Sequence, residues 1–279
     1  MATESKAEFE YELLENDTYA VTILTVTENL VIPSEYNGKK VSEITSNGEY
    51  LESRNSVLSV TIPNSITTIG YQSLFELRSL KNIEIPNSVT KIEDFAFGHC
   101  ASLTEIKIPE SVKTIGLCAF DRCTSLATIT LSEGLEEIGR QAFAYCEALK
   151  RIHIPKSVKY IGFWAFDGCD ALEEITVDTE NSAYRSIDGN LYSKDGTMFL
   201  KYAVGKKNTE ITIPNGVKEI GESAFLCAES LTAVNLPDSL TAIGNDAFYG
   251  CKLLETVNIP ASVKTVGEDA FAYCPLVKK

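Results

Sequence analysis

The chain has 279 residues, and 44% of them are hydrophobic, which is enough apolar material for one large domain or two small ones and argues against extensive disorder. Its 39 Asp and Glu residues outnumber 25 Lys and Arg residues, and the formal net charge of -14 disfavours binding to nucleic acid or anionic membrane surfaces. No apolar run reaches the length of about 18 residues that a membrane-spanning helix needs, and the start, MATESKAEFE, lacks the basic and then apolar pattern of a signal peptide. We therefore expect no nucleic-acid partner and no membrane insertion by this segment.

Residues 1–55 are expected to form an N-terminal cap and a first, irregular coil. The interval from Pro33 to Pro63 is 30 residues, which is longer than the intervals that follow. Terminal repeats of stacked folds are commonly atypical, because only one of their faces meets a neighbour. Alternating apolar residues predict a pair of strands that covers the exposed end: Phe9, Tyr11, Tyr19, Val21 and Ile23.

Residues 56–177 repeat one pattern every 23 residues. The period is most easily followed in a proline that serine replaces once: Pro63, Pro86, Pro109, Ser132 and Pro155. Before the proline, residues 106–108 alternate between apolar and polar as a half-buried strand does, and the same strand is predicted at residues 83–85. A turn and a second apolar pair lead to a glycine that breaks the extended path, such as Gly116, and an Ala-Phe pair then begins a compact turn.

Residues 178–213 interrupt this period. The interval from Pro155 to Pro214 is 59 residues, about 13 longer than two repeats. Asp188-Gly189 and Asp195-Gly196 are turn signals for hairpins, so we expect a coil that carries a β-hairpin insertion. The regular repeats resume over residues 214–279.

A single coil cannot bury its own apolar face. The Ile, Val, Leu and Phe side chains are covered only when the next coil stacks on it at about the 4.8 Å spacing of neighbouring strands. We therefore predict a curved, single-domain, β-rich solenoid of about ten 23-residue coils, with parallel strands on one face and no second independent core. The inward positions must repeat, whereas the outward positions are free to vary and to carry specificity.

The recurrent pattern IxIPxSVxxIGxxAFxxC, which runs from about Ile32 to Cys274, resembles the BspA-type leucine-rich repeats of bacterial surface proteins. Ser88 and its equivalents stand where other leucine-rich repeats carry Asn or Cys, so an inner Asn ladder is not expected. The segment YRSIDGNLYSKDGTMFLKY, from Tyr184, is similar to a hairpin insertion common in the family. The resemblance implies an α/β-type leucine-rich repeat horseshoe with short strands and short helical turns. It also implies a secreted or cell-surface binding protein, and some members of the family act as adhesins.

Six of the eight cysteines occupy one place in the coil: Cys100, Cys123, Cys146, Cys169, Cys251 and Cys274. Leu77 and Ala228 occupy the same place, so the position is an apolar core position, and we expect buried, reduced thiols there. Disulfide bonds between stacked neighbours are the alternative, because the backbone distances would allow them. Cys118 and Cys227 lie outside this column and are expected to be more exposed.

The sequence offers no constellation for catalysis. The two histidines, His99 and His153, occupy different parts of the coil, and a Ser or Cys nucleophile would need one of them as its base. No Gly-rich phosphate loop or HExxH motif is present, and a row of stacked thiols cannot converge on zinc. We expect no enzyme activity, no cofactor and no metal site.

Two groups of outward residues are candidates for binding a partner. The first group occupies the two positions that follow the glycine of each coil. These positions are polar in the late coils, but in earlier coils they carry apolar residues that form a predicted apolar edge: Phe95, Leu117, Cys118, Phe163 and Trp164. Burial of these side chains in a wider coil or under the insertion is the alternative. The second is a basic spot on the exposed strand face: Lys150, Arg151 and His153. Its alternative is an ordinary solvated sheet face.

The predicted function is that of a secreted or cell-surface solenoid, expected to be a monomer, that binds a protein in adhesion or in an interaction between host and microbe. A structural spacer that holds another domain away from a surface is the alternative, because a spacer needs only its inward residues. An enzyme or an enzyme accessory domain would need a pocket with convergent polar groups.

Overall fold

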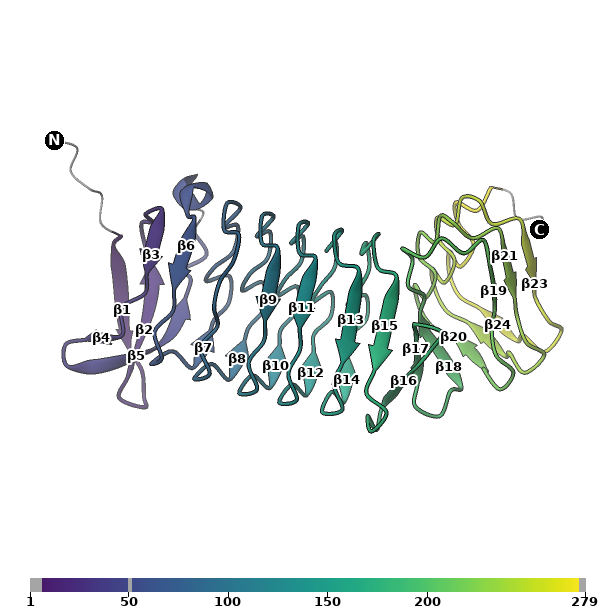
Figure 1. Ribbon diagram of the computed structural model, residues 1–279, viewed down its shortest axis with the longest axis horizontal. Helices are drawn as coiled ribbons and strands as arrows, with labels where there is room; N and C mark the ends of the chain where they lie inside the picture. The colour runs from purple at the N-terminus through teal and green to yellow at the C-terminus, as the bar shows by residue number, and fades with distance from the viewer. Residues whose placement is uncertain (1–6, 50–51, 276–279) are drawn as a thin grey trace. The chain divides into compact units, whose positions relative to one another are not determined.

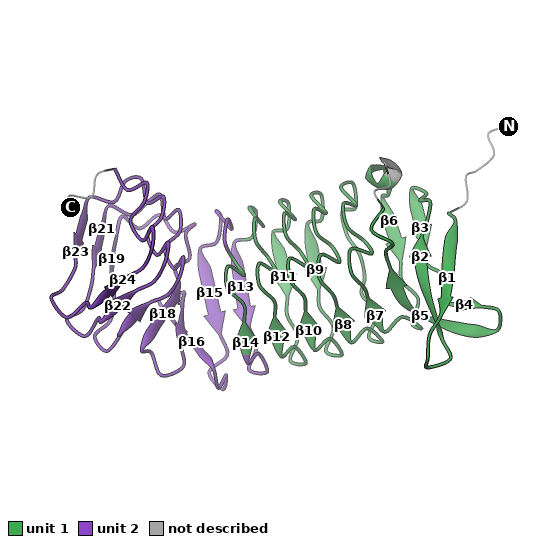
Figure 2. Cartoon of the chain, turned by 180° about the vertical axis from the view of Figure 1, so that it is seen from behind, with its two compact units in different colours: residues 1–149, 160–166 green, residues 150–159, 167–279 purple. Residues whose placement is uncertain are grey.

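The computed structural model describes residues 7–49 and 52–275, which form a β-solenoid of about 11 turns with repeats of about 23 residues and almost no helix (Figure 1). The predicted leucine-rich repeat solenoid is confirmed. Two compact units are present: unit 1 contains residues 1–149 and 160–166, and unit 2 contains residues 150–159 and 167–279 (Figure 2). That the whole chain unfolds as a single domain stays a prediction.

The larger sheet of unit 1 has the strand order β1-β2-β5-β7-β8-β10-β12-β14, and β4 pairs with β5. The pairs β1–β2 and β4–β5 are antiparallel, and the other pairs are parallel. Ile92, Ile115 and Ile138 are partners in successive strands and are buried, so each coil places the same side chain on its neighbour. These strands are β1 (Phe9–Leu13), β2 (Tyr19–Ile23), β4 (Glu35–Tyr36), β5 (Lys39–Thr45), β7 (Thr68–Ile69), β8 (Lys91–Ile92), β10 (Thr114–Ile115), β12 (Glu137–Ile138) and β14 (Tyr160–Ile161).

The strands before the proline positions of unit 1 form two short parallel pairs. They are β3 (Asn29–Val31) with β6 (Ser59–Thr61), and β9 (Glu105–Lys107) with β11 (Thr128–Thr130). The strand predicted at residues 83–85 is absent, although Ile83 and Ile85 are buried as expected. A cleft of about 680 Å³, lined by residues 60–62 and 84–88, separates this segment from β6.

The predicted strand pair at the N-terminal end is present as β1 and β2. Val21 and Ile23 of β2 are buried against the coil that follows. Tyr11 is the β1 partner of Val21, and its ring stacks on Tyr36 with centroids 3.8 Å apart, while Tyr19 meets Tyr36 edge-on at 5.1 Å. The aromatic side chains thus join β1 and β2 to the β4–β5 hairpin.

Unit 2 carries the insertion. Strands β16, β17 and β18 pair in antiparallel fashion, as the Asp-Gly turns predicted, and β18 then pairs in parallel with β20, so the insertion takes the place of a coil strand. One sheet of this unit has the order β16-β17-β18-β20-β22-β24, another β19-β21-β23, and β13 pairs with β15. The bounds are β13 (Arg151–Ile154), β15 (Glu174–Val177), β16 (Tyr184–Ile187), β17 (Asn190–Ser193), β18 (Met198–Lys201), β19 (Glu210–Thr212), β20 (Glu219–Ile220), β21 (Ala233–Asn235), β22 (Ala242–Ile243), β23 (Thr256–Asn258) and β24 (Thr265–Val266).

A ladder of phenylalanine rings runs through the core of each unit. In unit 1 the successive centroids of Phe97, Phe120, Phe143 and Phe166 are 5.1, 5.5 and 6.0 Å apart. In unit 2 those of Phe199, Phe225, Phe248 and Phe271 are 4.6, 4.8 and 5.0 Å apart. Except for Phe199, which lies in β18 and is the partner of Ile220, the rings of each unit occupy the same inward position of successive coils and follow the coil spacing.

The compact turns after the glycine contain no α-helix, and the one helix among residues 7–49 and 52–275 is the 3-10 helix η1 (Glu52–Ser56). Two residues of each turn have a left-handed backbone, such as Cys118 with φ 52° and Arg122 with φ 57°. The glycine that precedes the turn is required for a different reason. A Cβ added to Gly139 would lie 2.5 Å from the carbonyl carbon of Gly116, so successive coils approach too closely here for any side chain.

The cysteine column is buried, as predicted, and none of its cysteines forms a disulfide bond. Cys100, Cys123 and Cys146 each donate to a carbonyl oxygen of the neighbouring coil, with Sγ–O distances of 3.3 Å. Burial raises the pKa of Cys100 and of Cys251 to about 12. These thiols therefore stay protonated and unreactive near neutral pH.

We expect thiol labelling of the native protein to modify Cys227 first, because it is the exposed cysteine. The six column cysteines should react only after denaturation. Mass spectrometry after brief treatment with maleimide measures this, and Cys227→Ser should remove the rapid phase. Rapid modification of more than two thiols in the wild-type protein would contradict the prediction.

Candidate binding surface

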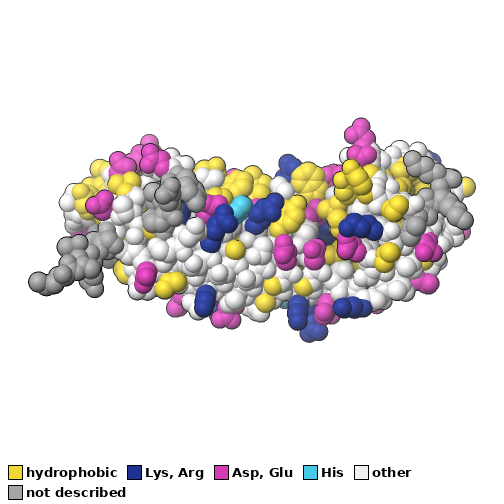
Figure 3. All heavy atoms as spheres, turned by 90° about the horizontal axis from the view of Figure 1, so that it is seen from above, with side chains coloured by type: hydrophobic (Ala, Val, Ile, Leu, Met, Phe, Trp, Pro, Cys, Tyr) yellow, Lys and Arg dark blue, Asp and Glu magenta, His cyan; other side chains and the backbone are white. Residues whose placement is uncertain are grey.

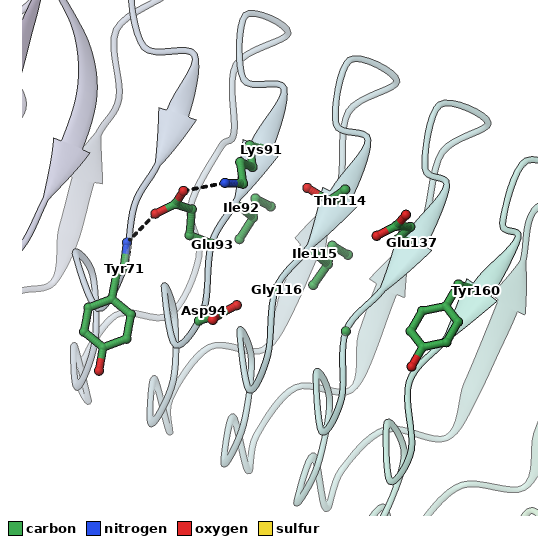
Figure 4. A pocket seen from close by; sticks show the side chains of 11 residues that line it. Tyr71, Lys91, Ile92, Glu93, Asp94, Thr114, Ile115, Gly116, Glu137 and Tyr160 are labelled. Carbon is green, nitrogen blue, oxygen red and sulfur yellow. Dashed lines mark hydrogen bonds and ion pairs between the residues drawn. The ribbon is translucent and has the colours of Figure 1, made fainter. Parts of the chain in front are cut away.

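A groove of about 370 Å³ lies on the outer face of β8, β10, β12 and β14 in unit 1 (Figure 4). The parallel register places Lys91, Thr114, Glu137 and Tyr160 in one row across these strands, and their side chains alternate with the buried isoleucines. Gly116 and Gly139 line the groove without side chains. The groove therefore runs across the coils, along the direction in which they stack.

Carboxylates give this groove an excess of negative charge. Glu93 accepts hydrogen bonds from the Tyr71 backbone N–H at 3.1 Å and from Lys91 Nζ at 2.6 Å. Asp94 Oδ1 accepts from the Leu117 N–H at 2.7 Å. Burial raises the pKa of the nearby Glu43 carboxyl, and repulsion from Glu93 raises it further, while Lys91 opposes the shift. The groove is lined by three carboxylates, those of Glu93, Asp94 and Glu137, and by a single lysine. This net negative charge suits neutral or basic groups.

Two exposed tyrosines mark the ends of the groove. Tyr71 is 48% exposed and Tyr160 is 50% exposed, and the two rings stand at opposite ends of the row in Figure 4. Tyrosine has an apolar ring and a polar tip, and it contributes strongly to binding when a partner covers it. The groove thus combines a small-residue floor, acidic walls and two aromatic ends.

The predicted apolar edge lies in the same unit, but only one of its members is fully exposed. Phe163 is 62% exposed. Phe95, Leu117 and Trp164 are half-buried. Phe95 has Tyr71 and Phe75 edge-on at 6.1 and 6.5 Å, so it supports the Tyr71 end of the groove.

Cys118 is a correction to the prediction. It is buried, with 6% exposure, and its Sγ lies 3.8 Å from Gln141 Oε1 of the next coil. Burial, followed by repulsion from Asp121 and Asp94, raises its pKa to about 11. The left-handed backbone at this position turns the side chain against the neighbouring coil, and Cys118 is therefore not part of an exposed surface.

Arg140 interrupts the predicted edge. It occupies the place between those of Leu117 and Phe163 in the stack, and its guanidinium lies 4.1 Å from the Trp164 ring centroid. This cation–π contact covers one face of the indole and explains why Trp164 is only half-exposed. Figure 3, which views one face of the molecule, likewise shows hydrophobic side chains in groups interrupted by charged ones.

The residues of the predicted basic spot lie in unit 2 and face solvent. Arg151 Nε is 3.6 Å from Glu174 Oε2, and His153 Nδ1 is 2.9 Å from the Thr176 hydroxyl oxygen on the adjacent strand. Lys150 is exposed. Glu174 therefore offsets much of the positive charge that the sequence suggested.

Sequence reasoning missed Tyr71, Tyr160 and the acidic groove between them. Tyr71 is the first residue after Gly70, which is one of the two positions that define the predicted apolar edge. An aromatic residue there was a recognisable signal of an exposed binding residue. Tyr160 lies in the outward row of the second strand, and only the register of successive coils shows that this row belongs to a groove. Among the described residues, no group of three His, Cys, Asp or Glu side chains is placed to hold a metal ion. Residues 7–49 and 52–275 contain no helix that is both long and apolar enough to cross a bilayer.

The model of the BspA-type leucine-rich repeat region matches residues 44–173 and 202–279, with six copies of the repeat. The chain belongs to this family. The two matched segments lie on either side of the antiparallel strands of the insertion. A comparison with curated proteins found no match.

Solved structures of bacterial proteins are similar to this solenoid. The pneumococcal vaccine antigen PcpA is 25% identical, with a TM-score of 0.85 over 98% of this chain and 78% of its own. A leucine rich cell surface protein from Faecalibacterium prausnitzii is 27% identical, with a TM-score of 0.73 over 100% of this chain and 89% of its own. A leucine-rich repeat protein from Bacteroides ovatus is 25% identical, with a TM-score of 0.58 over 97% of this chain and 80% of its own.

Proposed function

We propose that this BspA-type protein is a secreted or cell-surface solenoid that binds a protein partner without catalysis, in adhesion or in contact between a bacterium and its surroundings. The observation that carries the proposal is the group of three exposed aromatic side chains in unit 1: Tyr71, Tyr160 and Phe163. Two proteins with a similar structure, a cell surface protein and a vaccine antigen, support the location.

Exposed aromatic rings favour binding over a spacer role. Covering a large aromatic side chain removes about 150–250 Å² from water, and apolar area contributes about 25 cal/mol per Å². A spacer gains nothing from such residues, which increase its tendency to aggregate. The acidic walls of the groove favour a partner segment that is neutral or basic.

The apolar edge is a better docking site than the basic spot. Phe163 is exposed beside the Tyr160 end of the groove, three residues along the chain, whereas Arg151 is already paired with Glu174. We therefore assign the contact to Phe163, Tyr160 and Tyr71, with Phe95, Leu117 and Trp164 supporting them. Lys150, Arg151 and His153 form the competing site.

Binding to purified, immobilised extracellular-matrix proteins tests the proposal. Wild-type protein should bind at least one of them, and the double change Tyr160→Ala with Phe163→Ala should weaken binding by about 2 kcal/mol or more. Leu253→Ala is the matched control, because Leu253 is a 51% exposed apolar residue of unit 2.

Two results would contradict the assignment. Strong weakening of binding by Lys150→Ala with Arg151→Ala would move the site to the basic spot. A folded wild-type protein that binds none of the immobilised proteins would favour the spacer instead.

A further inference from the structure

Glu137 is the one carboxylate lining the groove of unit 1 that has no partner of its own. The carboxylates of Glu93 and Asp94 accept hydrogen bonds from Lys91 or from backbone N–H groups of neighbouring coils. Glu137 is exposed, and its side chain makes no hydrogen bond or ion pair with the residues that the structure describes. It therefore offers an uncompensated negative charge to a group that enters the groove.

The Tyr160 ring stands beside Glu137 on the next strand. The two residues are register partners of β12 and β14, so the strand spacing of about 4.8 Å separates their backbones (Figure 4). The ring is 50% exposed and makes no stacking or cation–π contact within residues 7–49 and 52–275. A free ring face and a free carboxylate thus lie within reach of one ligand group.

Two other rings of unit 1 show which group completes such a site. The guanidinium of Arg122 lies over the Tyr145 ring at 4.4 Å from its centroid, and that of Arg140 lies over the Trp164 ring at 4.1 Å. In both cases the arginine belongs to the coil that precedes the ring. At Tyr160 the preceding coil supplies a glutamate in place of an arginine. This ring therefore has a neighbouring anion but lacks the cation that covers the other two.

An arginine from a partner would satisfy the ring and the carboxylate together. A guanidinium is planar, so one of its faces stacks on an aromatic ring while its N–H groups donate to a carboxylate. A lysine ammonium can pair with Glu137 but has no plane to lay on Tyr160. The surrounding charge favours a cation as well, because three carboxylates and a single lysine line the groove.

The groove has the length for an extended segment around that arginine. From β7 to β14 the row of strands crosses four spacings, which is about 19 Å at the usual strand separation. An extended chain covers this distance in about six residues. Gly116 and Gly139 leave the floor free of side chains, and Tyr71 offers a second exposed ring at the far end.

We propose that the groove selects an extended segment that carries arginine, with the guanidinium seated between the Glu137 carboxylate and the Tyr160 ring. The inference rests on the protein-binding function proposed for unit 1 and adds the chemistry of the partner. Tyr160 contributes contact area to any partner, whereas Glu137 distinguishes a cationic segment from a neutral one.

Three octapeptides with blocked ends test the proposal on the full chain. Their alternate positions carry arginine, lysine or citrulline, which keeps the shape of arginine without its charge, and the remaining positions are glycine and serine. Calorimetry at low salt should give a dissociation constant on the order of 0.1 mM for the arginine peptide. The lysine peptide should bind about threefold more weakly and the citrulline peptide at least about tenfold more weakly. Added salt should weaken binding of the arginine peptide.

Two substitutions that change the net charge equally separate this site from general attraction to an acidic protein. Glu137→Gln should weaken binding of the arginine peptide about tenfold. Glu105→Gln removes an exposed carboxylate of β9 outside the groove and should weaken it less than about twofold. Tyr160→Ala should weaken it about fivefold. All three side chains are exposed, so the melting temperature should change little.

Equal affinity for the arginine and citrulline peptides, or equal effects of Glu137→Gln and Glu105→Gln, would overturn the proposal. So would a folded wild-type protein that binds none of the peptides. In each of these cases, binding to matrix proteins that depends on Tyr160 and Phe163 would still support the proposed function. Conversely, arginine binding that depends on Glu137, without any matrix partner, would support the arginine site and count only against that function. A wild-type dimer in ultracentrifugation that Glu137→Gln dissociates would make a second copy of the chain the occupant and would overturn the proposal too.

Discussion

Replacing Phe120 by alanine is expected to lower the free energy of unfolding by about 3–5 kcal/mol. Phe120 is fully buried, and its ring stacks between Phe97 at 5.1 Å and Phe143 at 5.5 Å. Removing it leaves a cavity that faces both neighbouring coils. The coils cannot collapse into this cavity, because ladder hydrogen bonds on either side, such as Phe120 N–H to the Ala142 carbonyl at 2.8 Å, fix their spacing. Urea unfolding followed by circular dichroism measures the change.

Phe163→Ala is the matched control for Phe120→Ala. Phe163 belongs to the same unit but is 62% exposed, so its removal should change the free energy of unfolding by no more than about 0.5 kcal/mol. If both changes cost the same, the phenylalanine ladder does not support the stack. A wild-type curve with two separate transitions would also show that the chain does not unfold as the single domain that its repeats predict.

The inward half of the fold could be predicted from the sequence because stacking makes it repeat. Ile115 and Cys146 recur every 23 residues, and both are buried. Each inward position packs against the same position of the next coil, so the packing constraint there is the same in every coil. A residue type that recurs at such a position therefore indicates that the position is buried. The insertion could also be predicted, because its Asp-Gly pairs are local turn signals that need no knowledge of the rest of the fold.

The outward half was harder to predict, because it depends on the direction of each side chain as well as its polarity. Cys118 and Trp164 occupy the same left-handed place, yet Gln141 covers the first and Arg140 covers the second. Both covering residues come from a neighbouring coil. The strand predicted at residues 83–85 is missing although its apolar pattern is intact, so an alternating pattern alone does not establish strand pairing.

The candidate sites depend on residues that no local pattern connects. Tyr71 and Tyr160 are four coils apart in the stack, and their relation appears only when the row between them is traced across the strands.

Replacing Asp167 by alanine should destabilise unit 2 by about 3–5 kcal/mol. Asp167 and Lys201 form an ion pair in which the side chains are 11% and 9% exposed, and Lys201 Nζ also donates to the Ser223 carbonyl oxygen at 3.2 Å. Lys201 lies at the end of β18, so the pair fastens the insertion to the coil that precedes it. Without Asp167, the ammonium group stays largely out of water with no opposite charge beside it, and that desolvation is what the folded state loses.

An exposed ion pair of the same unit is the control for Asp167→Ala. Lys252 and Glu229 are 2.7 Å apart, but their side chains are 67% and 61% exposed, so Glu229→Ala should cost no more than about 1 kcal/mol. The double change Asp167→Leu with Lys201→Met should recover much of the loss, because it removes the buried charge together with its partner. Guanidinium unfolding of the four proteins separates the cases. If Asp167→Ala destabilises the protein no more than Glu229→Ala, water reaches Lys201 in solution and the pair does not fasten the insertion. If the double change is as unstable as Asp167→Ala alone, lost packing rather than the unpaired ammonium accounts for the cost.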